Sequence, residues 1–181
     1  MILGVILARG GSKRLPRKNL RELRGIPLVG WAVKAALGSA WLDRVVVSSD
    51  DEEILRVARE YGAEALKRPK HMATDEATSY PPLFHAADRY RPDHIVLLQP
   101  TSPLMRAEDI DMCVALAVDS SAACVTAHNG VANGAVYAAK TDWLRSVGTF
   151  EGVGLQHEMP AERSVDVNTL DDFNEAERLM A

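Results

Sequence analysis

The feature that most constrains this chain is its N-terminal stretch, in which an apolar run passes directly into a glycine-rich basic loop. Residues 2–7 read Ile-Leu-Gly-Val-Ile-Leu, and the following loop carries Gly10, Gly11 and the basic residues Arg9, Lys13, Arg14, Arg17 and Lys18. An apolar run rich in β-branched residues that ends in glycines is typical of a buried strand. In an open α/β sheet, ligands bind outside the carboxyl ends of the strands, so this loop stands where a ligand is expected.

The residue types of the loop indicate that the ligand is a polyphosphate. Glycines let backbone N–H groups approach an anion, and arginine can hold two of its oxygens at once. The loop is not a Walker motif, because no Gly-Lys-Ser/Thr closes it, and it lacks the Gly-x-Gly-x-x-Gly spacing of dinucleotide-binding loops. A solvated basic loop after a core strand is the alternative interpretation, and the position after the first strand favours phosphate binding.

Composition and charge narrow the class of protein. The chain has 181 residues, of which 47% are hydrophobic and 25% charged, so we expect one domain over residues 1–181. A net charge of -4 argues against a general nucleic-acid surface. No stretch reaches the length of a membrane span, and residues 1–8 lack the basic start of a signal peptide, so no membrane partner is expected. Cys113 and Cys124 lie in apolar surroundings and are interpreted as reduced core residues of a cytoplasmic protein.

Strand and helix patterns alternate along the rest of the chain. The expected strands are 43–49, 63–66, 94–98 and 122–127, and the helical patterns lie at 28–36, 54–61, 83–90, 108–118, from 141, and 170–180. This alternation predicts an α/β fold, a three-layer α/β/α sandwich of the Rossmann-like type with a mostly parallel sheet.

Two further motifs lie after strand patterns. Gln99-Pro100-Thr101-Ser102-Pro103 follows the run 94–98, and its two prolines fix the backbone, so that Gln99 stands on a rigid platform. Its amide can donate and accept hydrogen bonds, as recognition of a base or sugar requires. Near the C-terminus, the alternation of residues 165–168 predicts a short strand with Asp166 and Asn168 on one face. Paired oxygens suit Mg²⁺, with asparagine the weaker ligand; alternatively Asn168 and Thr169 cap the helix that follows.

Residues 8–19, Ala-Arg-Gly-Gly-Ser-Lys-Arg-Leu-Pro-Arg-Lys-Asn, resemble the signature loop of the N-acylneuraminate cytidylyltransferases. These enzymes join CTP to a nine-carbon acidic sugar and release pyrophosphate. Four later segments also resemble the family's motifs: residues 72–80 (Ala-x-Asp-x-Ala-x-Ser), 97–104 (Leu-Leu-Gln-Pro-Thr-Ser-Pro-Leu), 133–137 (Asn-Gly-Ala-x-Tyr) and 166–169 (Asp-x-Asp-Thr).

The resemblance implies a nucleotidyltransferase fold and a set of site residues. The implied catalytic residues are Arg9, Lys18 and Asp166, and the implied metal ligands for Mg²⁺ are Asp166 and Asn168. The implied substrate-binding residues are Ala8, Gly10, Gly11, Ser12, Lys13, Asn19, Asp75, Thr78, Ser79, Gln99, Pro100, Thr101, Ser102 and Asn133. Asp75, Thr78 and Ser79 also suit the cap of a helix, and the two interpretations are compatible.

The chain departs from the family pattern in three places. Met105 stands where the family has arginine, and Asn168 stands where it has aspartate. Near residues 128–132, relatives carry a long stretch that binds the acidic sugar and supplies a dimerisation arm, whereas here Asn129-Gly130 has the pattern of a plain hairpin turn. The resemblance therefore allows a homodimer, but without the arm that usually forms it.

The leading hypothesis is a cytidylyltransferase that uses CTP and an acidic 3-deoxy sugar as its partners. A second hypothesis keeps the fold and changes the acceptor to another sugar or a pterin cofactor, and the Gln99 motif argues against the pterin. A third is a nucleotide-binding protein that has lost catalysis. No Ser-His-Asp order, zinc motif or covalent nucleophile stands out, which fits a transfer that depends on positioning and charge stabilisation.

Overall fold

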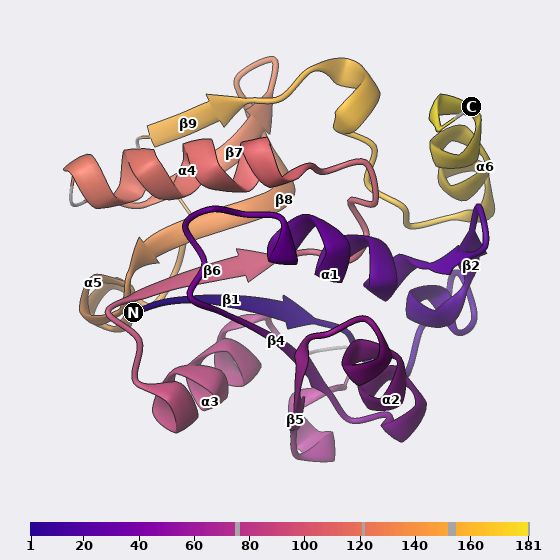
Figure 1. Ribbon diagram of the computed structural model, residues 1–181, viewed down its shortest axis with the longest axis horizontal. Helices are drawn as coiled ribbons and strands as arrows, with labels where there is room; N and C mark the ends of the chain where they lie inside the picture. The colour runs from indigo at the N-terminus through magenta and orange to yellow at the C-terminus, as the bar shows by residue number, and fades with distance from the viewer. Residues whose placement is uncertain (75–76, 121, 152–154, 181) are drawn as a thin grey trace.

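A central sheet with helices on both faces organises the chain (Figure 1). The structure is a computed structural model that describes residues 1–74, 77–120, 122–151 and 155–180. Within these ranges the sheet has seven strands in the order β5-β4-β1-β6-β8-β7-β9. Strand β8 is antiparallel to its neighbours β6 and β7, and the other described pairs are parallel. The predicted mostly parallel sheet is confirmed.

The central strands β1, β4 and β6 follow β-branched apolar runs of the sequence, whereas β5 and β9 contain no β-branched residue. The strands of the sheet are β1 (Ile2–Leu7), β4 (Arg44–Ser49), β5 (Glu64–Lys67), β6 (His94–Leu98), β7 (Cys124–His128), β8 (Val131–Lys140) and β9 (Leu155–Glu158). A small separate hairpin consists of β2 (Glu22–Leu23) and β3 (Ile26–Pro27).

Six α-helices lie between or after these strands in the described ranges. They are α1 (Leu28–Leu37), α2 (Glu52–Glu60), α3 (Tyr80–Tyr90), α4 (Ala107–Ser120), α5 (Thr141–Val147) and α6 (Leu170–Leu179). Short 3-10 helices lie at Lys18–Leu20, Lys70–Met72 and Ala161–Arg163.

Alternating side chains of the strands build a separate core on each face of the sheet. On β1, Ile6 packs with residues of α1, α2 and α4, whereas Leu3 and Val5 pack with residues of α3 and α5. This period of two gives the three-layer sandwich that the sequence predicts. Helix α6 stands beside the sandwich, next to β2 (Figure 1).

The strand order reverses at β1, which places a ligand position between β1 and β6. From β1 the chain moves outward to β4 and β5, and it then returns to place β6 on the other side of β1. The loops that follow β1 and β6 therefore diverge from adjacent carboxyl ends, and such a switch point leaves a crevice. The first basic loop and the Gln99 motif are these two loops.

The structure corrects the expected secondary structure at two places near the C-terminus. Strand β9 is absent from the predicted set, although it pairs in parallel with β7. Residues 165–168 form neither a strand nor a helix; Val167 N–H makes a single backbone hydrogen bond, to Thr101 O at 2.7 Å. The alternation of this segment instead reflects the packing of Val165 and Val167 in a small apolar cluster.

Several local predictions are confirmed. Asn129 and Gly130 both have positive φ, 53° and 73°, and join β7 to β8 as a two-residue hairpin turn. Thr169 caps α6 and exchanges hydrogen bonds with Asp172 in a capping box. Residues 148–151 form neither a helix nor a strand, and residues 152–154 lie outside the described ranges. No helix in the described ranges is both long and apolar enough to cross a bilayer.

Candidate active site

The start of the basic loop is fixed by its contact with the residues that follow β4. Gly10 N–H donates to the Asp50 carboxylate at 3.0 Å. A Cβ on Gly10 would lie 2.8 Å from Asp51 Oδ2, so this position requires glycine, whereas a Cβ on Gly11 would meet nothing within 4 Å. The close approach at Gly10 therefore serves the packing of the loop against Asp50 and Asp51.

Arg9 and Asn19 link the two ends of the loop. The Asn19 side-chain amide donates to Arg9 O at 2.9 Å, and a guanidinium nitrogen of Arg9 donates to Thr74 O at 2.9 Å. Asn19 is buried, and its Oδ1 is a buried acceptor without a hydrogen-bond partner in the structure. An unpartnered buried acceptor is costly, so Asn19 Oδ1 is a candidate contact for a ligand.

Three cavities lie along the carboxyl edge of the sheet. The first, which we call the basic cavity, has a volume of about 300 Å³ and is lined by Arg9, Gly11, Ser12, Lys13, Arg14, Lys18, Asn19 and Asn168. Among these lining residues four are cationic and none is acidic. This composition suits a multiply charged anion.

The second, which we call the central cavity, has a volume of about 250 Å³. Its polar lining comprises Arg9, Lys18, Asn19, Arg68, Thr74, Thr78, Ser79, Gln99 and Thr101, and its apolar lining comprises Leu7, Met72, Ala77, Pro82 and Pro100. It shares Arg9, Lys18 and Asn19 with the basic cavity, so the two adjoin.

The third, which we call the aromatic cavity, has a volume of about 500 Å³. It is lined by Thr78, Ser79, Tyr80, Leu97, Gln99, Val125, Ala132, Tyr137, Phe150, Glu151 and Gln156. Phe150 packs between the other two aromatic rings, with centroids 5.3 Å from Tyr137 and 6.3 Å from Tyr80. It shares Thr78, Ser79 and Gln99 with the central cavity, so the three cavities adjoin one another in a row.

Lys18 connects the basic loop to the C-terminal segment. Its Nζ donates to Val167 O at 2.9 Å and to Asn168 Oδ1 at 3.3 Å. Burial lowers the pKa of Lys18, the charge of Asp166 opposes this, and Arg14 and Arg9 add to the lowering. Lys18 is thus a partly desolvated cation beside other cations, and an anionic ligand would relieve this repulsion.

Asp166 lies within electrostatic reach of two of the cavities. Its charge acts on Lys18 in the basic cavity, and it also contributes, after burial and Tyr80, to raising the pKa of Tyr137 in the aromatic cavity. The carboxylate of Asp166 is exposed and its Oδ2 accepts from Asn168 Nδ2 at 2.6 Å. Asp166 therefore lies near the site, although it lines none of the three cavities.

Arg68 is a site residue that the sequence analysis does not single out. It follows β5 and lines the central cavity, with only 5% of its surface exposed. Burial lowers the pKa of Arg68, against the charge of Asp50, and its Nε is buried without a hydrogen-bond partner. A buried guanidinium that faces a cavity and lacks a full set of acceptors is prepared for an anionic or carbonyl ligand.

Most of the predicted site residues line one of these cavities in the structure, and a few do not. Those that line a cavity are Arg9, Gly11, Ser12, Lys13, Lys18, Asn19, Thr78, Ser79, Gln99, Pro100, Thr101 and Asn168. Ala8, Ser102 and Gly10 do not line these cavities: Ala8 and Ser102 are buried, and Gly10 is half-buried. Asp75 is outside the described residues. Ser79 is the cap residue of α3 but makes no side-chain capping hydrogen bond.

Asn133 lies near the beginning of β8 and lines none of the three cavities. Its Oδ1 accepts from Thr126 Oγ1 at 2.7 Å, and its Nδ2 donates to Ser164 Oγ at 3.2 Å. These bonds tie β8 to β7 and to the segment that leads to Asp166. In the structure Asn133 therefore supports the site from behind.

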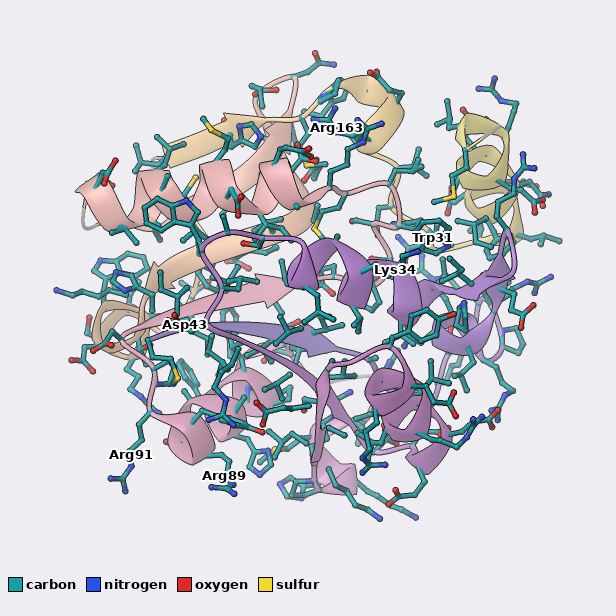
Figure 2. The ribbon with its side chains drawn as sticks, in the orientation of Figure 1. Trp31, Lys34, Asp43, Arg89, Arg91 and Arg163 are labelled. Carbon is teal, nitrogen blue, oxygen red and sulfur yellow. The ribbon has the colours of Figure 1, made fainter. Side chains whose placement is uncertain are left out.

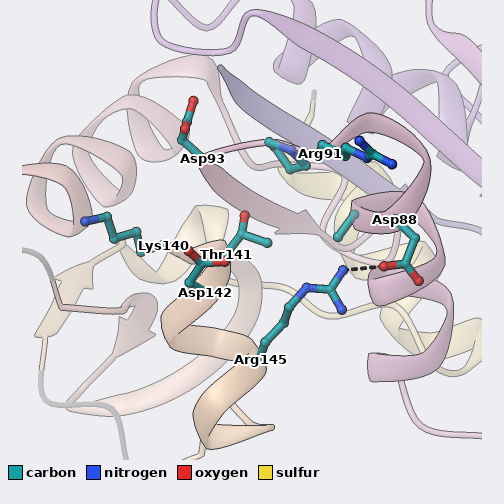
Figure 3. Close-up of a pocket in the computed structure, with 9 residues that line it drawn as sticks. Asp88, Arg91, Asp93, Lys140, Thr141, Asp142 and Arg145 are labelled. Carbon is teal, nitrogen blue, oxygen red and sulfur yellow. Dashed lines mark hydrogen bonds and ion pairs between the residues drawn. The ribbon is translucent and has the colours of Figure 1, made fainter.

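A further cavity of about 520 Å³ lies at the opposite end of the sheet, where β6 begins and β8 ends (Figure 3). Figure 3 shows Arg145 pointing toward Asp88, with which it forms an ion pair. The other charged lining residues are Arg91, Lys140, Asp93 and Asp142, so positive and negative groups balance. This cavity contains none of the motif residues and lies away from the carboxyl edge.

Comparison with known proteins agrees with this geometry. The family model described as cytidylyltransferase matches residues 3–177. The pseudaminic acid cytidylyltransferase of Campylobacter jejuni subsp. jejuni serotype O:2 is 42% identical over 112 residues, which cover 59% of this chain and 48% of that protein. The N-acylneuraminate cytidylyltransferase of Escherichia coli O18:K1:H7 is 40% identical over 116 residues, which cover 64% of this chain and 28% of that protein. The chain thus spans about half the length, or less, of the curated relatives it matches.

The fold is similar to that of solved structures over its full length. The structure of CMP:2-keto-3-deoxy-manno-octonic acid synthetase complexed with CTP superposes with a TM-score of 0.83 at 19% identity, covering 99% of this chain and 98% of the other. This likeness confirms the nucleotidyltransferase fold that the first loop implies. Since the family model matches nearly the whole sequence, the chain belongs to the cytidylyltransferase family.

Proposed function

We propose that this protein transfers CMP from CTP to an acidic 3-deoxy sugar of the sialic acid-like nonulosonate type and releases pyrophosphate. The observation that carries the proposal is the succession of three adjoining cavities, from a cation-lined end through a polar middle to an aromatic end. A triphosphate, a nucleoside and an acceptor sugar have this succession of chemistries. Family membership and the names of the relatives support the choice of CTP and of an acidic sugar.

The triphosphate is assigned to the basic cavity. Arg9 and Lys18 neutralise the phosphates on the side of the central cavity, since both residues line both cavities. Lys13 and the backbone at Gly11 and Ser12 line the far end. Glycine and serine there leave room for backbone N–H groups to approach phosphate oxygens.

The nucleoside is assigned to the central cavity. Arg68, Asn19 Oδ1 and the Gln99 amide offer donors and acceptors there, and Thr78, Ser79 and Thr101 add hydroxyls. The edge of a base needs both kinds of group. Pro100 holds the platform that begins at Gln99, whose N–H donates to Ala135 O at 3.1 Å.

The donor set near Asp166 fits one divalent cation held partly by the ligand. The Asp166 carboxylate is exposed, whereas Asn168 Oδ1 already accepts from Arg14 at 3.1 Å and from Lys18 at 3.3 Å. We therefore assign Mg²⁺ to Asp166, with Asn168 as a ligand only if these two cations release its oxygen. Bound there, Mg²⁺ would polarise phosphate oxygens and lower the charge repulsion toward an attacking hydroxyl.

The chain's own residues would promote the transfer by position and charge. A hydroxyl of the acceptor in the aromatic cavity attacks the α-phosphate; the new bond joins sugar oxygen to phosphorus, and the bond to the pyrophosphate oxygen breaks. Arg9 and Lys18 stabilise the charge that develops on the leaving pyrophosphate. The carboxylate of Asp166, whose charge acts on both Lys18 and Tyr137, favours departure of the hydroxyl proton. Gln99, which lines two of the cavities, orients the acceptor against the nucleotide.

One observation favours a second candidate, a transferase of the same fold with a different acceptor. Among the described residues that line the aromatic cavity, the charged side chain is Glu151, and none is Lys or Arg. A sugar carboxylate placed there would need a cation from the central cavity, such as Arg68. A neutral sugar would need none. A nucleotide-binding protein without catalysis remains the third candidate, which binding without turnover would identify.

We propose further that residues 1–181 act as one domain and that the family's insert near residues 128–132 is replaced by the two-residue turn between β7 and β8. Without that arm, a homodimer would have to use another surface, and sedimentation of the protein tests this. The buried free thiols of Cys113 and Cys124 support a cytoplasmic location.

Pyrophosphate release tests the proposed activity. The protein is incubated with Mg²⁺ and each of CTP, GTP, UTP and ATP, against a panel of acidic nonulosonic and octulosonic sugars and their neutral reduced analogues. We expect release with CTP and one acidic sugar, and a loss of roughly a hundredfold in kcat for Arg9→Ala. Arg59→Ala, which removes an exposed cation at the end of α2, serves as the matched control and should not change the rate. CTP binding without release in any combination would contradict the transferase.

A further inference from the structure

Asn168 connects the cations of the basic cavity to the carboxylate of Asp166. Its Oδ1 accepts from Arg14 at 3.1 Å and from Lys18 Nζ at 3.3 Å, while its Nδ2 donates to Asp166 Oδ2 at 2.6 Å. An amide presents an acceptor on one side and two donors on the other, so it can serve both neighbours at once. The orientation of the Asn168 amide is thus fixed by charge on both sides.

A carboxylate at position 168 could not reproduce this arrangement. It would still accept from Arg14 and Lys18, but it has no donor for Asp166, and two carboxylates in contact repel each other. Because the Asn168 side chain is a neutral amide, Asp166 is the one negative charge of this pair, where an aspartate at position 168 would add a second.

The remaining nearby acid is already engaged in the structure. Asp172 Oδ2 accepts from the backbone N–H groups of Asn168 at 2.9 Å and of Thr169 at 2.7 Å, which forms the cap of α6. In the part of the chain that the structure describes, no group of three or more Asp, Glu, His or Cys side chains is placed to hold a metal ion. Asp166 alone offers a charged ligand, beside two cations.

A divalent ion needs more oxygens than this. Mg²⁺ takes six oxygen ligands, usually from one or two carboxylates together with waters and phosphate groups of the substrate. At this site one carboxylate is available, and the positive charges of Arg14 and Lys18 repel a free cation. A triphosphate in the basic cavity would reverse the local charge and would add several oxygens.

We propose that this protein does not bind its divalent ion without nucleotide, that the ion enters as its complex with the nucleoside triphosphate, and that Asn168 is the residue that imposes this order. The proposal rests on the proposed function, because it assumes that a nucleotide occupies the basic cavity. It concerns binding alone, so it can be tested without an acceptor and without turnover.

Mn²⁺ is the probe, because the free ion is counted directly by its electron paramagnetic resonance signal. The protein is titrated with Mn²⁺ alone and then with Mn²⁺ in the presence of CTP and no acceptor. We expect no saturable binding to the unmodified protein alone and clear binding with CTP. Asn168→Asp should bind Mn²⁺ without nucleotide at least about tenfold more tightly than the unmodified protein, because a second carboxylate joins the site. Asn174→Asp, the same change on the exposed face of α6, is the matched control and should gain nothing.

Three different results would contradict the binding order, the role of Asn168 and the proposed function, respectively. Saturable Mn²⁺ binding to the unmodified protein alone that Asp166→Asn abolishes would overturn the binding order. An Asn168→Asp variant that folds, as its melting curve shows, yet binds Mn²⁺ no better than Asn174→Asp would overturn the role of Asn168. If CTP does not bind, with or without Mn²⁺, this result would instead contradict the proposed function.

Discussion

Removing Arg163 should destabilise the protein strongly, because Arg163 neutralises a carboxylate that is almost completely buried. Asp109 lies in the first turn of α4 with 1% of its surface exposed. Arg163 donates to it twice, at 2.7 and 3.1 Å, and His157 Nε2 and the backbone N–H of Arg106 lie at 3.4 and 3.0 Å. Figure 2 shows Arg163 beside this end of α4. The perturbation we propose is Arg163→Ala.

The magnitude follows from what the substitution leaves behind. Hydrogen bonds to charged groups contribute about 1.5 to 3 kcal/mol each, and breaking a buried ion pair by removing one partner costs about 3 to 5 kcal/mol. Two donors remain to Asp109, so we expect a loss of about 3 to 4 kcal/mol in the free energy of unfolding. For a chain of this size, this lowers the Tm by roughly 10 °C.

Thermal unfolding followed by circular dichroism measures the effect. Arg178→Ala is the matched control, because Arg178 also forms a two-bond ion pair, with Glu175, but on the exposed surface of α6. That pair should contribute less than about 1 kcal/mol. The double variant Asp109→Leu/Arg163→Met should recover most of the loss, since an apolar pair leaves no buried charge. Equal losses for Arg163→Ala and Arg178→Ala would refute the reasoning.

The pH dependence gives an independent check of the same pair. Burial opposes ionisation of Asp109, but the hydrogen bonds from Arg163 and from the Arg106 N–H outweigh it and lower the pKa of Asp109 below its ordinary value of 3.8. Because the folded pKa is the lower one, the stabilisation is complete above the unfolded pKa, about 3.9, and is lost as the pH falls through the folded pKa. The Tm difference between the unmodified protein and Arg163→Ala should therefore narrow in acid. A difference that stays constant would contradict the assignment.

Two further predictions concern the site itself. Arg68→Leu should leave the free energy of unfolding unchanged or higher, because it removes a buried cation with an unpartnered Nε, yet it should weaken CTP binding by about tenfold or more, as calorimetric titration would show. Gly10→Ala should lower the Tm and weaken CTP binding, because its Cβ would clash with Asp51, whereas Gly11→Ala, with open space around its Cβ, should leave the Tm unchanged; equal melting of the two variants would contradict this.

The parts of the fold that can be predicted from the sequence are those determined by residues close together in the sequence. The run 94–98 is apolar and β-branched, and it forms β6 at the predicted bounds. Asn129-Gly130 specifies a hairpin turn through its positive φ, and the turn is present. The basic loop and the Gln99 motif each follow a predicted strand, and because these strands are parallel neighbours the two segments share the central cavity.

The elements that the sequence analysis missed depend on contacts with residues that are distant in the sequence. Strand β9 reads Leu-Gln-His-Glu, with neither alternation nor β-branched residues, and it is a strand because β7 presents an edge to it. Arg68 has no motif of its own; its role comes from the end of β5 lying beside the first loop. The aromatic cavity combines Tyr80, Tyr137 and Phe150, which no spacing rule connects.

Apolar packing explains why the basic loop and the segment 165–168 lie side by side. Leu15 of the basic loop and Val167 beside Asp166 are both buried in one small cluster, together with Phe173 and Ala176 of α6. This cluster is separate from the two cores of the sandwich, and it joins the loop that carries the cations to the segment that carries Asp166. Apolar packing against α6 thus holds the two segments that carry these charges next to each other. The final helix therefore belongs to the site as much as to the fold, although none of its residues lines a cavity described along the carboxyl edge.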